Sequence, residues 1–371
     1  MCFPSIIRAV PSAMAGTLHT PFPARHDCDL WGRMPVSRAD QPSPLRIDPA
    51  AVTDRIAEAL RRQLGESLHR RGFVVAISGG VDSSVCAGLA VRAVGKDHVF
   101  GLFLPERDSD PRSRELFLEW VKKLGIPYAI EDIAPILEAA GCYRRRDGAI
   151  RRVVPEYGEG WKSKLVIPGG LLDSDRLNTT QLAVQPPDGE LRLVRLPAAE
   201  YREIVAATNF KQRVRAMMAY FHADRLHYAV VGTPNRLEYD QGFFVKGGDG
   251  LADTKPIAHL YKTQVYQLAE YLGVPEGVTA RPPTTDTFSL PQSQEEFYFA
   301  LPMRQMDLAL HAKNEGWAPQ RAASELGLTA EQVARVYHDI DQKRSTTAYL
   351  HARPLLAEPV AEIHPRGEGH A

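Results

Sequence analysis

The stretch that decides the fold runs Phe73-Val-Val-Ala-Ile-Ser-Gly-Gly-Val-Asp-Ser-Ser84. Its first five residues form a short apolar run rich in β-branched side chains, which favours a buried parallel strand. The next three, Ser78 to Gly80, are small, so the backbone can approach a ligand closely and turn several N–H groups in one direction. An apolar pattern then resumes at Val85. The stretch therefore predicts a strand, a tight loop and a helix whose N-terminus faces the loop.

Such a loop predicts an anion site, and Asp82 inside it is a candidate ligand for a metal ion that accompanies the anion. The loop is not a Walker loop, because no Gly-Lys-Ser/Thr follows the glycines. Ser-Gly-Gly-Val-Asp-Ser-Ser instead resembles the pyrophosphatase loop of enzymes that split ATP between its α and β phosphates to adenylate a substrate. The structural alternative is an ordinary glycine-rich turn between a strand and a helix.

The flanking sequence continues the alternation of strands and helices. Further strands are expected at 99–104, 127–130 and 227–232, with helices at 50–68, capped by Asp48 and Pro49, and at 116–124. Alternation at these intervals predicts an α/β fold with a doubly wound parallel sheet, of the Rossmann-like ATP pyrophosphatase type. Ligands of such sheets bind beyond the carboxyl ends of the strands, where the loops at Ser78 and Thr233 both lie.

The expected domain organisation is a flexible leader at 1–47, an ATP pyrophosphatase domain at 48–350 with a helical C-terminal region, and a tail at 351–371. Residues 141–197 interrupt the alternation and are predicted to form a turn-rich insertion, which we call the excursion, with one edge strand near 191–196. The basic triplet Arg144–Arg146 is predicted to be a solvated face. The segment 322–336 has the pattern of a helix-turn-helix, and we expect a structural helical hairpin there.

Composition limits the classes of function. The 371 residues carry 45 basic and 45 acidic side chains and no net charge, which argues against a nucleic-acid partner. The four cysteines lack metal-ligand spacing and are expected to be free thiols in a reducing cytoplasm. No apolar run approaches the roughly 20 residues that cross a bilayer, so we expect a cytoplasmic protein without a membrane anchor.

A second cluster, Gly232 to Ile257 followed by Tyr261-Lys-Thr263, is dense in glycine, acids and lysines. A solvated loop would have a similar composition, but Thr233 ends a strand on the face where a ligand is expected. The whole pattern resembles ammonia-dependent NAD synthetase, from about residue 52 to 350 apart from the excursion. The matching blocks are the Ser78 loop, Asn209-Phe-Lys-Gln-Arg-Val-Arg215, Gly232 to Thr263, Pro283-Thr-Thr-Asp286 and Lys343-Arg344.

The resemblance implies a role for each matching residue. It places the ATP pyrophosphate on Ser78, Gly79, Gly80, Asp82 and Ser83. Further ATP contacts would come from Thr233, Lys262 and Thr284, with Lys262 also catalytic because charge builds on the departing pyrophosphate. Asp82 and Glu238 would hold Mg²⁺, which prefers hard oxygen donors. The implied contacts to the acid substrate and ammonia are Asn209, Arg213, Lys246, Asp249, Asp253, Gln342 and Lys343.

The implied reaction is amide formation in two steps. ATP adenylates a carboxylate with loss of pyrophosphate, and ammonia then displaces AMP. Asp249 or Asp253 would take a proton from ammonium, its main form at neutral pH. The acid would be deamido-NAD, the family's acceptor. The resemblance also implies a homodimer, the commonest assembly, and a separate glutaminase subunit is a possible source of ammonia.

The chain departs from the family at two places. Where the family has His-Lys-Arg near the C-terminus, this chain has Gln342-Lys343-Arg344, which replaces a titratable ring with an amide. The excursion also precedes the substrate-facing segment 209–215, where we expect it to lie beside the acid. Both changes keep open a divergent amide ligase that acts on another carboxylic acid, in a secondary-metabolite or sugar pathway. Further alternatives are a tRNA-modifying ligase, a universal-stress-type nucleotide-binding module and a non-catalytic structural protein.

Overall fold

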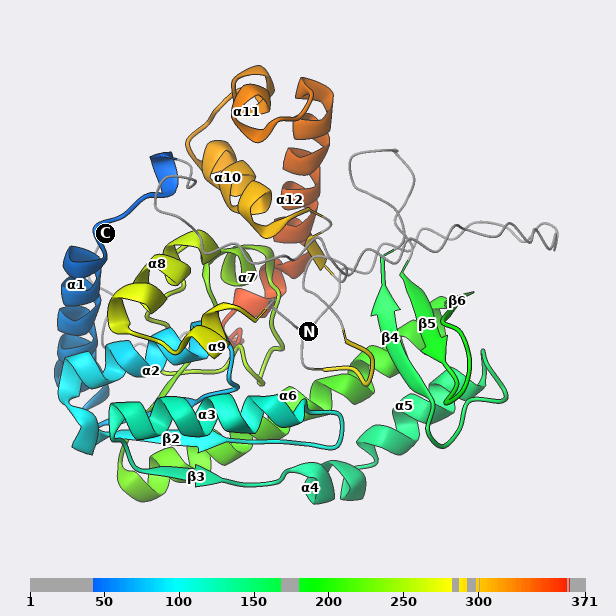
Figure 1. The fold of residues 1–371 in the computed structure, drawn as a ribbon, viewed down its shortest axis with the longest axis horizontal. Coiled ribbons are helices and arrows are strands. Elements are labelled where there is room, and N and C mark those ends of the chain that lie inside the picture. Colours follow the sequence, from blue (N-terminus) through cyan, green and yellow to red (C-terminus); the bar gives the residue numbers. More distant parts are fainter. Residues whose placement is uncertain are drawn as a thin grey trace.

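The computed structural model describes residues 43–167, 180–281, 287–291, 298–299, 301–358 and 360. This part of the chain contains a parallel sheet with the strand order β3–β2–β1–β7, of which β2 and β3 are labelled in Figure 1. Its strands are β1 Phe73–Ala76, β2 Val99–Phe103, β3 Tyr128–Ile130 and β7 Ala229–Val231. The chain moves outward from β1 to β3 and then returns to the other side of β1. This reversal makes the sheet doubly wound, as predicted.

Helices cover both faces of this sheet. The described α-helices are α1 Pro49–Arg62, α2 Val81–Val94, α3 Pro111–Leu124, α4 Ala134–Ala139, α5 Cys142–Arg151, α6 Ala198–Leu226, α7 Arg236–Gln241, α8 Lys262–Leu272, α9 Glu276–Thr279, α10 Met303–Asn314, α11 Pro319–Leu326 and α12 Ala330–His351. Short 3-10 turns at Ser43–Leu45 and Lys96–His98 and a π-helical turn at Gln63–Leu68 complete the helical elements.

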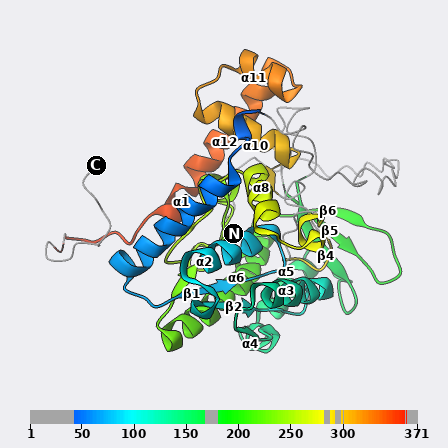
Figure 2. The same cartoon turned by 60° about the vertical axis from the view of Figure 1, so that its left-hand side comes forward.

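The two faces of β1 bury alternate residues, as expected for a central parallel strand. Phe73 and Val75 belong to one core cluster, which α1, α2, α3 and α8 complete. Val74 belongs to a second cluster on the opposite face, which α4, α5 and α6 cover. Figure 2 shows α1 and α2 on one side of the strands and α6 on the other. Both faces are therefore closed, and the carboxyl edge of the sheet is left to form a site.

The first helix begins where the sequence predicts. The side chain of Asp48 accepts from the backbone N–H groups of Ala50 and Ala51, and Pro49 occupies the first helical position. An exposed cap of this kind is a local signal, because the capping residue and the N–H groups that it satisfies are neighbours in the sequence.

The excursion is more regular than predicted. It contains helix α5 and an antiparallel sheet of β4 Lys162–Val166, β5 Gln181–Gln185 and β6 Arg192–Arg195, in that order (Figure 1). The predicted edge strand is confirmed as β6, whereas α5, β4 and β5 were missed. Residues at positions 142, 143, 146, 149 and 150 of α5 are buried. This is a helical face, but Arg146 stands in its middle and interrupts the apolar pattern.

The prediction that the basic triplet is a solvated face is wrong for its last member. Arg144 and Arg145 are exposed, but the Arg146 side chain is only 3% exposed. Its guanidinium donates to Asp108 at 2.6 Å and pairs with Asp147 at 2.9 Å. Burial of an arginine requires such partners, because an unpaired buried charge is strongly destabilising.

A buried lysine joins this ion-pair group from α6. Lys211, whose side chain is 0% exposed, donates from Nζ to Glu106, Asp108 and the Thr287 carbonyl, each at 2.8 Å. Glu106 also accepts from the hydroxyl of Tyr143 at 2.9 Å. We call Glu106, Asp108, Arg146 and Lys211 the buried charge cluster. It connects the segment after β2 to α5 and α6.

The C-terminal helices α10, α11 and α12 extend from one side of the body (Figure 1). Leu326 of α11 and Val333 and Val336 of α12 are buried in one core cluster, so the predicted helical hairpin is confirmed. Two of the cysteines, Cys86 and Cys142, are buried free thiols. None of the described helices is long and apolar enough to cross a membrane.

Candidate active site

The loop from β1 to α2 is held by its own small side chains. Ser83 Oγ accepts from the N–H of Ser78 at 3.2 Å and donates to the Gly80 carbonyl at 3.0 Å. Ser78 Oγ accepts from the Gly80 N–H at 3.3 Å. Gly80 caps α2 but has no side chain to accept from the first N–H groups of the helix. The positive end of α2 is therefore directed at the space above the loop.

Gly79 cannot be replaced without disturbing this loop. Its φ of +82° lies in the left-handed region, and a Cβ at this position would lie 2.9 Å from the carbonyl oxygen of Ser113 on α3. The position thus requires glycine both for its conformation and for the close approach of a second helix.

An ion pair lies at the entrance to α2. Lys262, the first residue of α8, is 2% exposed and pairs through Nζ with the carboxylate of Asp82. Asp82 also accepts from the side-chain amide of Asn235 at 3.2 Å. Burial lowers the pKa of Lys262, but the carboxylates of Asp82 and Glu238 outweigh this effect and raise it above its ordinary value. Lys262 is therefore a buried cation at neutral pH.

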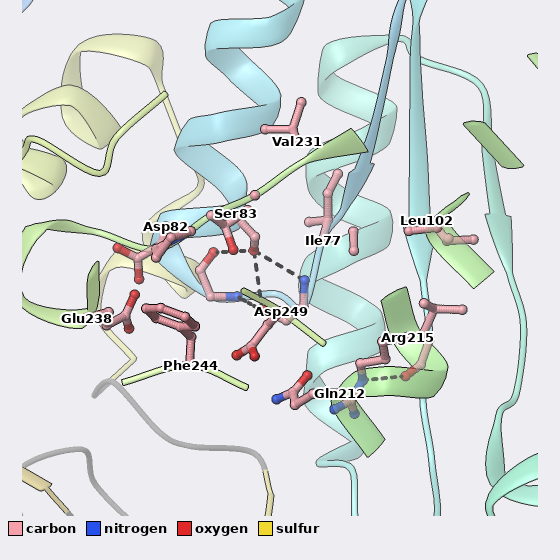
Figure 3. Close-up of a pocket in the computed structure, with 18 of the residues that line it drawn as sticks. Ile77, Asp82, Ser83, Leu102, Gln212, Arg215, Val231, Glu238, Phe244 and Asp249 are labelled. Carbon is pink, nitrogen blue, oxygen red and sulfur yellow. Dashed lines mark hydrogen bonds between the residues drawn. The ribbon is translucent and has the colours of Figure 1, made fainter. Parts of the chain in front are cut away.

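The loop after β7 carries the second carboxylate to the same place. Asn235 caps α7 by accepting from the N–H groups of Leu237 and Glu238, and Glu238 accepts in return from the Asn235 N–H at 3.1 Å. This capping box fixes Glu238 on the first turn of α7. Figure 3 shows Asp82 and Glu238 at the same end of the cavity.

These loops surround a cavity of about 270 Å³ beyond the carboxyl ends of β1, β2 and β7. One part of its wall is apolar and includes Ile77, Leu102 and Val231; in Figure 3, Ile77 and Leu102 lie on the other side of Ser83 from Asp82 and Glu238. The predicted site residues that line the cavity are Ser78, Gly80, Asp82, Ser83, Thr233, Glu238, Asp249 and Lys262. The cavity can thus accept an aromatic ring at one end and anionic groups at the other.

The two candidate proton acceptors are placed differently. Asp249 lines the cavity, and its Oδ1 accepts from the Val245 N–H at 2.7 Å. Asp253 is not among the lining residues, and its two oxygens accept from the Val230 N–H at 2.7 Å and the Tyr220 hydroxyl at 3.2 Å. Val230 lies on the edge strand β7, where Asp253 occupies an N–H group that a further strand would otherwise use.

Three of the other residues predicted to meet the acid, Asn209, Arg213 and Lys246, lie outside the described lining of the cavity. Asn209 is buried on α6, whereas Arg213 and Lys246 are exposed. Arg213 Nε donates to the Lys246 carbonyl at 3.4 Å, so these two cations are neighbours on the surface. Lys246 Nζ donates to the carbonyl of Tyr349 at 2.7 Å, which ties this loop to the end of α12.

Gln342 and Lys343, the predicted acid contacts near the C-terminus, are also separate from the cavity wall. Gln342 is exposed on α12, and Lys343 is buried, with Nζ donating to the Tyr298 carbonyl and pairing with Asp339, both at 2.7 Å. Gly79 supports the loop from behind rather than lining the cavity. Thr284 lies outside the described residues.

Several residues of the cavity wall were not predicted. Arg281 lines it and is held by Ser113 Oγ at 2.8 Å and Asp110 at 3.1 Å. Gln212 and Arg215 project from α6 toward the same space (Figure 3). Both lie within the matching segment 209–215, but the resemblance assigned no role to either of them. Arg281 has no motif of its own, and only its place just before the block at 283–286 could have indicated it.

Comparison with known proteins agrees with this geometry. The sequence model of the NAD synthase family matches residues 52–149 and 177–347. The chain belongs to the NAD synthase family. An NH(3)-dependent NAD(+) synthetase from Mesorhizobium japonicum is 60% identical over 318 residues, which cover 86% of this chain and 99% of that protein. A protein of the same description from Rhizobium rhizogenes is 59% identical, over 85% of this chain and 95% of the relative.

Solved structures agree on the fold. An NH3-dependent NAD synthetase from Campylobacter jejuni has a TM-score of 0.54 at 21% identity, with 84% of this chain and all of that chain covered. An NMN synthetase from Francisella tularensis has a TM-score of 0.56 at 21% identity, with 85% of this chain and all of that chain covered. All predicted site residues, Thr284 included, fall within the two segments that the family model matches. The predicted family is therefore confirmed.

Proposed function

We propose that the protein is an ATP-dependent amide ligase that converts deamido-NAD and ammonia to NAD, with release of AMP and pyrophosphate. Relatives at about 60% identity over nearly their whole length carry the name of this activity. The observation that carries the proposal is the meeting of three features at one sheet edge. These are the glycine loop at the start of α2, the Lys262–Asp82 pair and the carboxylate of Glu238. A divergent ligase for another acid is not favoured.

The cavity orients ATP by its two unlike ends. The adenine ring fits the apolar wall of Ile77, Leu102 and Val231, where a flat ring loses contact with water. The phosphates then reach the loop at Ser78 and the N-terminus of α2, which attract anions. This orientation leaves the α-phosphate near Thr233 and Asp249, between the loops that follow β1 and β7.

Lys262 stabilises the charge that develops on pyrophosphate as it leaves. A lysine has three N–H donors, and within the described chain one hydrogen bond, to Asp82, occupies its Nζ. The remaining donors are available to phosphate oxygens. Because Lys262 is buried, its field is screened little by water, which strengthens its effect on the transition state.

The two carboxylates fit a magnesium ion that accompanies ATP. Mg²⁺ is commonly bound by one or two protein carboxylates, and phosphate oxygens and waters supply the other ligands. Asp82 and Glu238 provide such a pair, and no larger group of acidic, histidine or cysteine ligands occurs among the residues that the structure describes. When bound, the ion would neutralise phosphate charge. The protein side chains would then orient the phosphates and exclude water.

Asp249 is the better candidate for the proton acceptor. It lines the cavity, and one of its oxygens accepts from the Val245 N–H. Its other oxygen is the candidate acceptor for a proton of ammonium. Asp253 instead has partners on both oxygens and supports β7. We therefore assign proton removal to Asp249 and a structural role beside the acceptor site to Asp253.

The cavity of about 270 Å³ is too small to hold ATP and a dinucleotide together, so the dinucleotide acid must extend beyond it. Arg213 and Lys246 are exposed outside the cavity and offer positive charge to its phosphates. A second subunit can cover this surface, and Met217 and Phe221 on α6, which are 53% and 56% exposed, offer an apolar contact. We infer a homodimer with the acid bound between subunits. Sedimentation of a monomer under assay conditions would contradict this arrangement.

The experiment is a turnover assay of the purified chain with ATP, Mg²⁺ and an ammonium salt. Deamido-NAD, nicotinic acid mononucleotide and unrelated carboxylic acids are compared as acceptors, and glutamine replaces ammonium in a parallel series. We expect NAD formation from deamido-NAD at about 1 per second or faster, slower turnover with the other acids, and none with glutamine alone. Rapid amidation of another acid beside negligible NAD formation would contradict the proposed substrate. Activity with glutamine alone would exclude the need for a separate glutaminase subunit.

A further inference from the structure

Helix α8 begins without a capping side chain of its own. The residue at its N-cap is Tyr261, whose side chain makes no hydrogen bond to the first turn. Helices normally place Ser, Thr, Asp or Asn at this position, because the first N–H groups have no partner within the helix. Gln264 satisfies the Tyr261 N–H at 3.1 Å. The next two N–H groups, those of Lys262 and Thr263, need acceptors from elsewhere in the fold.

A carboxylate from a distant helix supplies both acceptors. Asp307 on α10 is 0% exposed, and its Oδ1 accepts from the Lys262 N–H at 3.2 Å. Its Oδ2 accepts from the Thr263 N–H at 2.7 Å. Asp307 is separated from Lys262 by 45 positions. The cap of α8 therefore comes from the C-terminal helical region rather than from the local sequence.

The residue capped in this way is the lysine of the phosphate site. The Lys262 backbone is held by Asp307, while its Nζ pairs with Asp82 at the start of α2. The side chain spans the space between two carboxylates and is only 2% exposed. A movement of the first turn of α8 would therefore change how the ammonium group can reach Asp82 and the glycine loop.

We propose that Asp307 is a positioning residue for the reaction, which fixes Lys262 over the phosphate site by capping α8 from α10. The inference rests on the proposed role of Lys262 in stabilising the departing pyrophosphate. Through this contact the helices α10 to α12 act on the geometry of a site to which their described residues contribute no lining side chain.

A cap that only stabilises the fold would behave differently. Loss of such a cap lowers the free energy of unfolding, but it does not selectively slow a step that depends on one lysine. A positioning residue instead changes kcat while the binding of ATP is largely preserved, because Lys262 acts most strongly when charge develops. Displacement of a catalytic group by about 1 Å can cost about 100-fold in rate.

The test compares Asp307→Asn with Asp48→Asn. In both variants an amide replaces a carboxylate that accepts from two backbone N–H groups at a helix N-terminus, but Asp48 caps α1, away from the cavity. Burial raises the pKa of Asp307 to about 7, so a neutral side chain of the same shape is compatible with this position. If Asp307→Asn gives no folded protein, Asp307→Ser, whose shorter side chain has one oxygen in place of the two that accept from the Lys262 and Thr263 N–H groups, is measured with the same expected result.

We expect Asp307→Asn to lower kcat by about 10-fold to 100-fold with KM for ATP changed less than about twofold. Asp48→Asn should leave both constants unchanged. In a Lys262→Ala background, Asp307→Asn should slow turnover further by less than about twofold, because the group that it positions is absent. An unchanged kcat in Asp307→Asn, or its full effect in the Lys262→Ala background, would overturn the inference. Normal turnover of Lys262→Ala alone would contradict the proposed function of Lys262 instead.

Discussion

Two buried lysines of this molecule make ion pairs, and we propose different roles for them. Lys262 lines the cavity and has one hydrogen-bond partner in the described chain at its Nζ. Lys211 lies in the buried charge cluster and donates to Glu106, Asp108 and the Thr287 carbonyl, which uses all three of its N–H donors. Burial and ion pairing therefore do not identify a site by themselves. A binding lysine also needs donors that the protein has not already used, and space in front of them.

The largest effect is expected from removing the charge of the structural lysine. Lys211→Met leaves Glu106 and Asp108 buried without their shared cation, which typically costs about 3–5 kcal/mol of folding free energy. Turnover per folded molecule should change little, because Lys211 has no donor left for substrate. Urea unfolding and a rate normalised to folded protein measure the two quantities. A large loss of kcat with unchanged stability would reverse the assignment of the two lysines.

The opposite pattern is expected at Lys262 in the proposed phosphate site. Lys262→Ala should reduce kcat by about 100-fold or more, the usual effect of removing a preorganised charge stabiliser, and should affect stability less than Lys211→Met. Lys262→Arg serves as the control, since it keeps the charge but changes its geometry. Near-normal turnover of Lys262→Ala in steady-state assays would mean that the lysine does not act on the departing pyrophosphate.

Asp108 in the buried charge cluster is expected to make the free energy of unfolding depend on pH. Burial raises the pKa of Asp108, but Lys211 and Arg146 outweigh it and lower the pKa to about 2. The unfolded chain therefore takes up this proton first as the pH falls. Asp108 contributes about 2 kcal/mol of stability above about pH 5, which is lost between about pH 4 and pH 2. Asp108→Asn should be less stable than the parent at pH 7, with the difference shrinking toward pH 2 in acid-unfolding curves.

The smallest effect is expected at an exposed ion pair of the excursion. Arg152 pairs with Glu200 and Glu203 on the surface, where water and salt screen the attraction. Arg152→Ala should leave both the unfolding midpoint and turnover unchanged within error. A clear loss of stability would show that the excursion depends on surface pairs as well as on the buried charge cluster.

The cavity around the Ser78 loop and the buried charge cluster also differ in how well the sequence predicts them. The strand β1, the loop at Ser78 and the helix after it could be predicted from twelve consecutive residues, because the apolar run is contiguous and the loop's side-chain hydrogen bonds join near neighbours in the sequence. Asp82 and Lys262 could be assigned through the family resemblance, and the structure brings both to one cavity. The same resemblance did not separate Asp249 from Asp253. The structure distinguishes them because the Val230 N–H on β7 donates to the carboxylate of Asp253.

The buried charge cluster could not be predicted, because each of its contacts joins segments far apart in the chain. The triplet that contains Arg146 has the pattern of a solvated surface. Its pairing with Asp108, 38 positions away, is visible only in the structure. For the same reason the cap that Asp307 supplies to α8 has no local signature. Hydrophobic patterns and residue propensities therefore do not predict which distant residues pair with a charged side chain.

The central claim is that the carboxylate is adenylated before ammonia attacks, and oxygen transfer tests it most directly. Deamido-NAD labelled with ¹⁸O in its carboxylate is incubated with the enzyme, ATP, Mg²⁺ and ammonium, and the products are resolved by mass spectrometry. Adenylation predicts one labelled oxygen in AMP, one retained in the amide of NAD and none in pyrophosphate. Label in inorganic phosphate beside ADP, or unlabelled AMP beside newly formed NAD, would contradict the account.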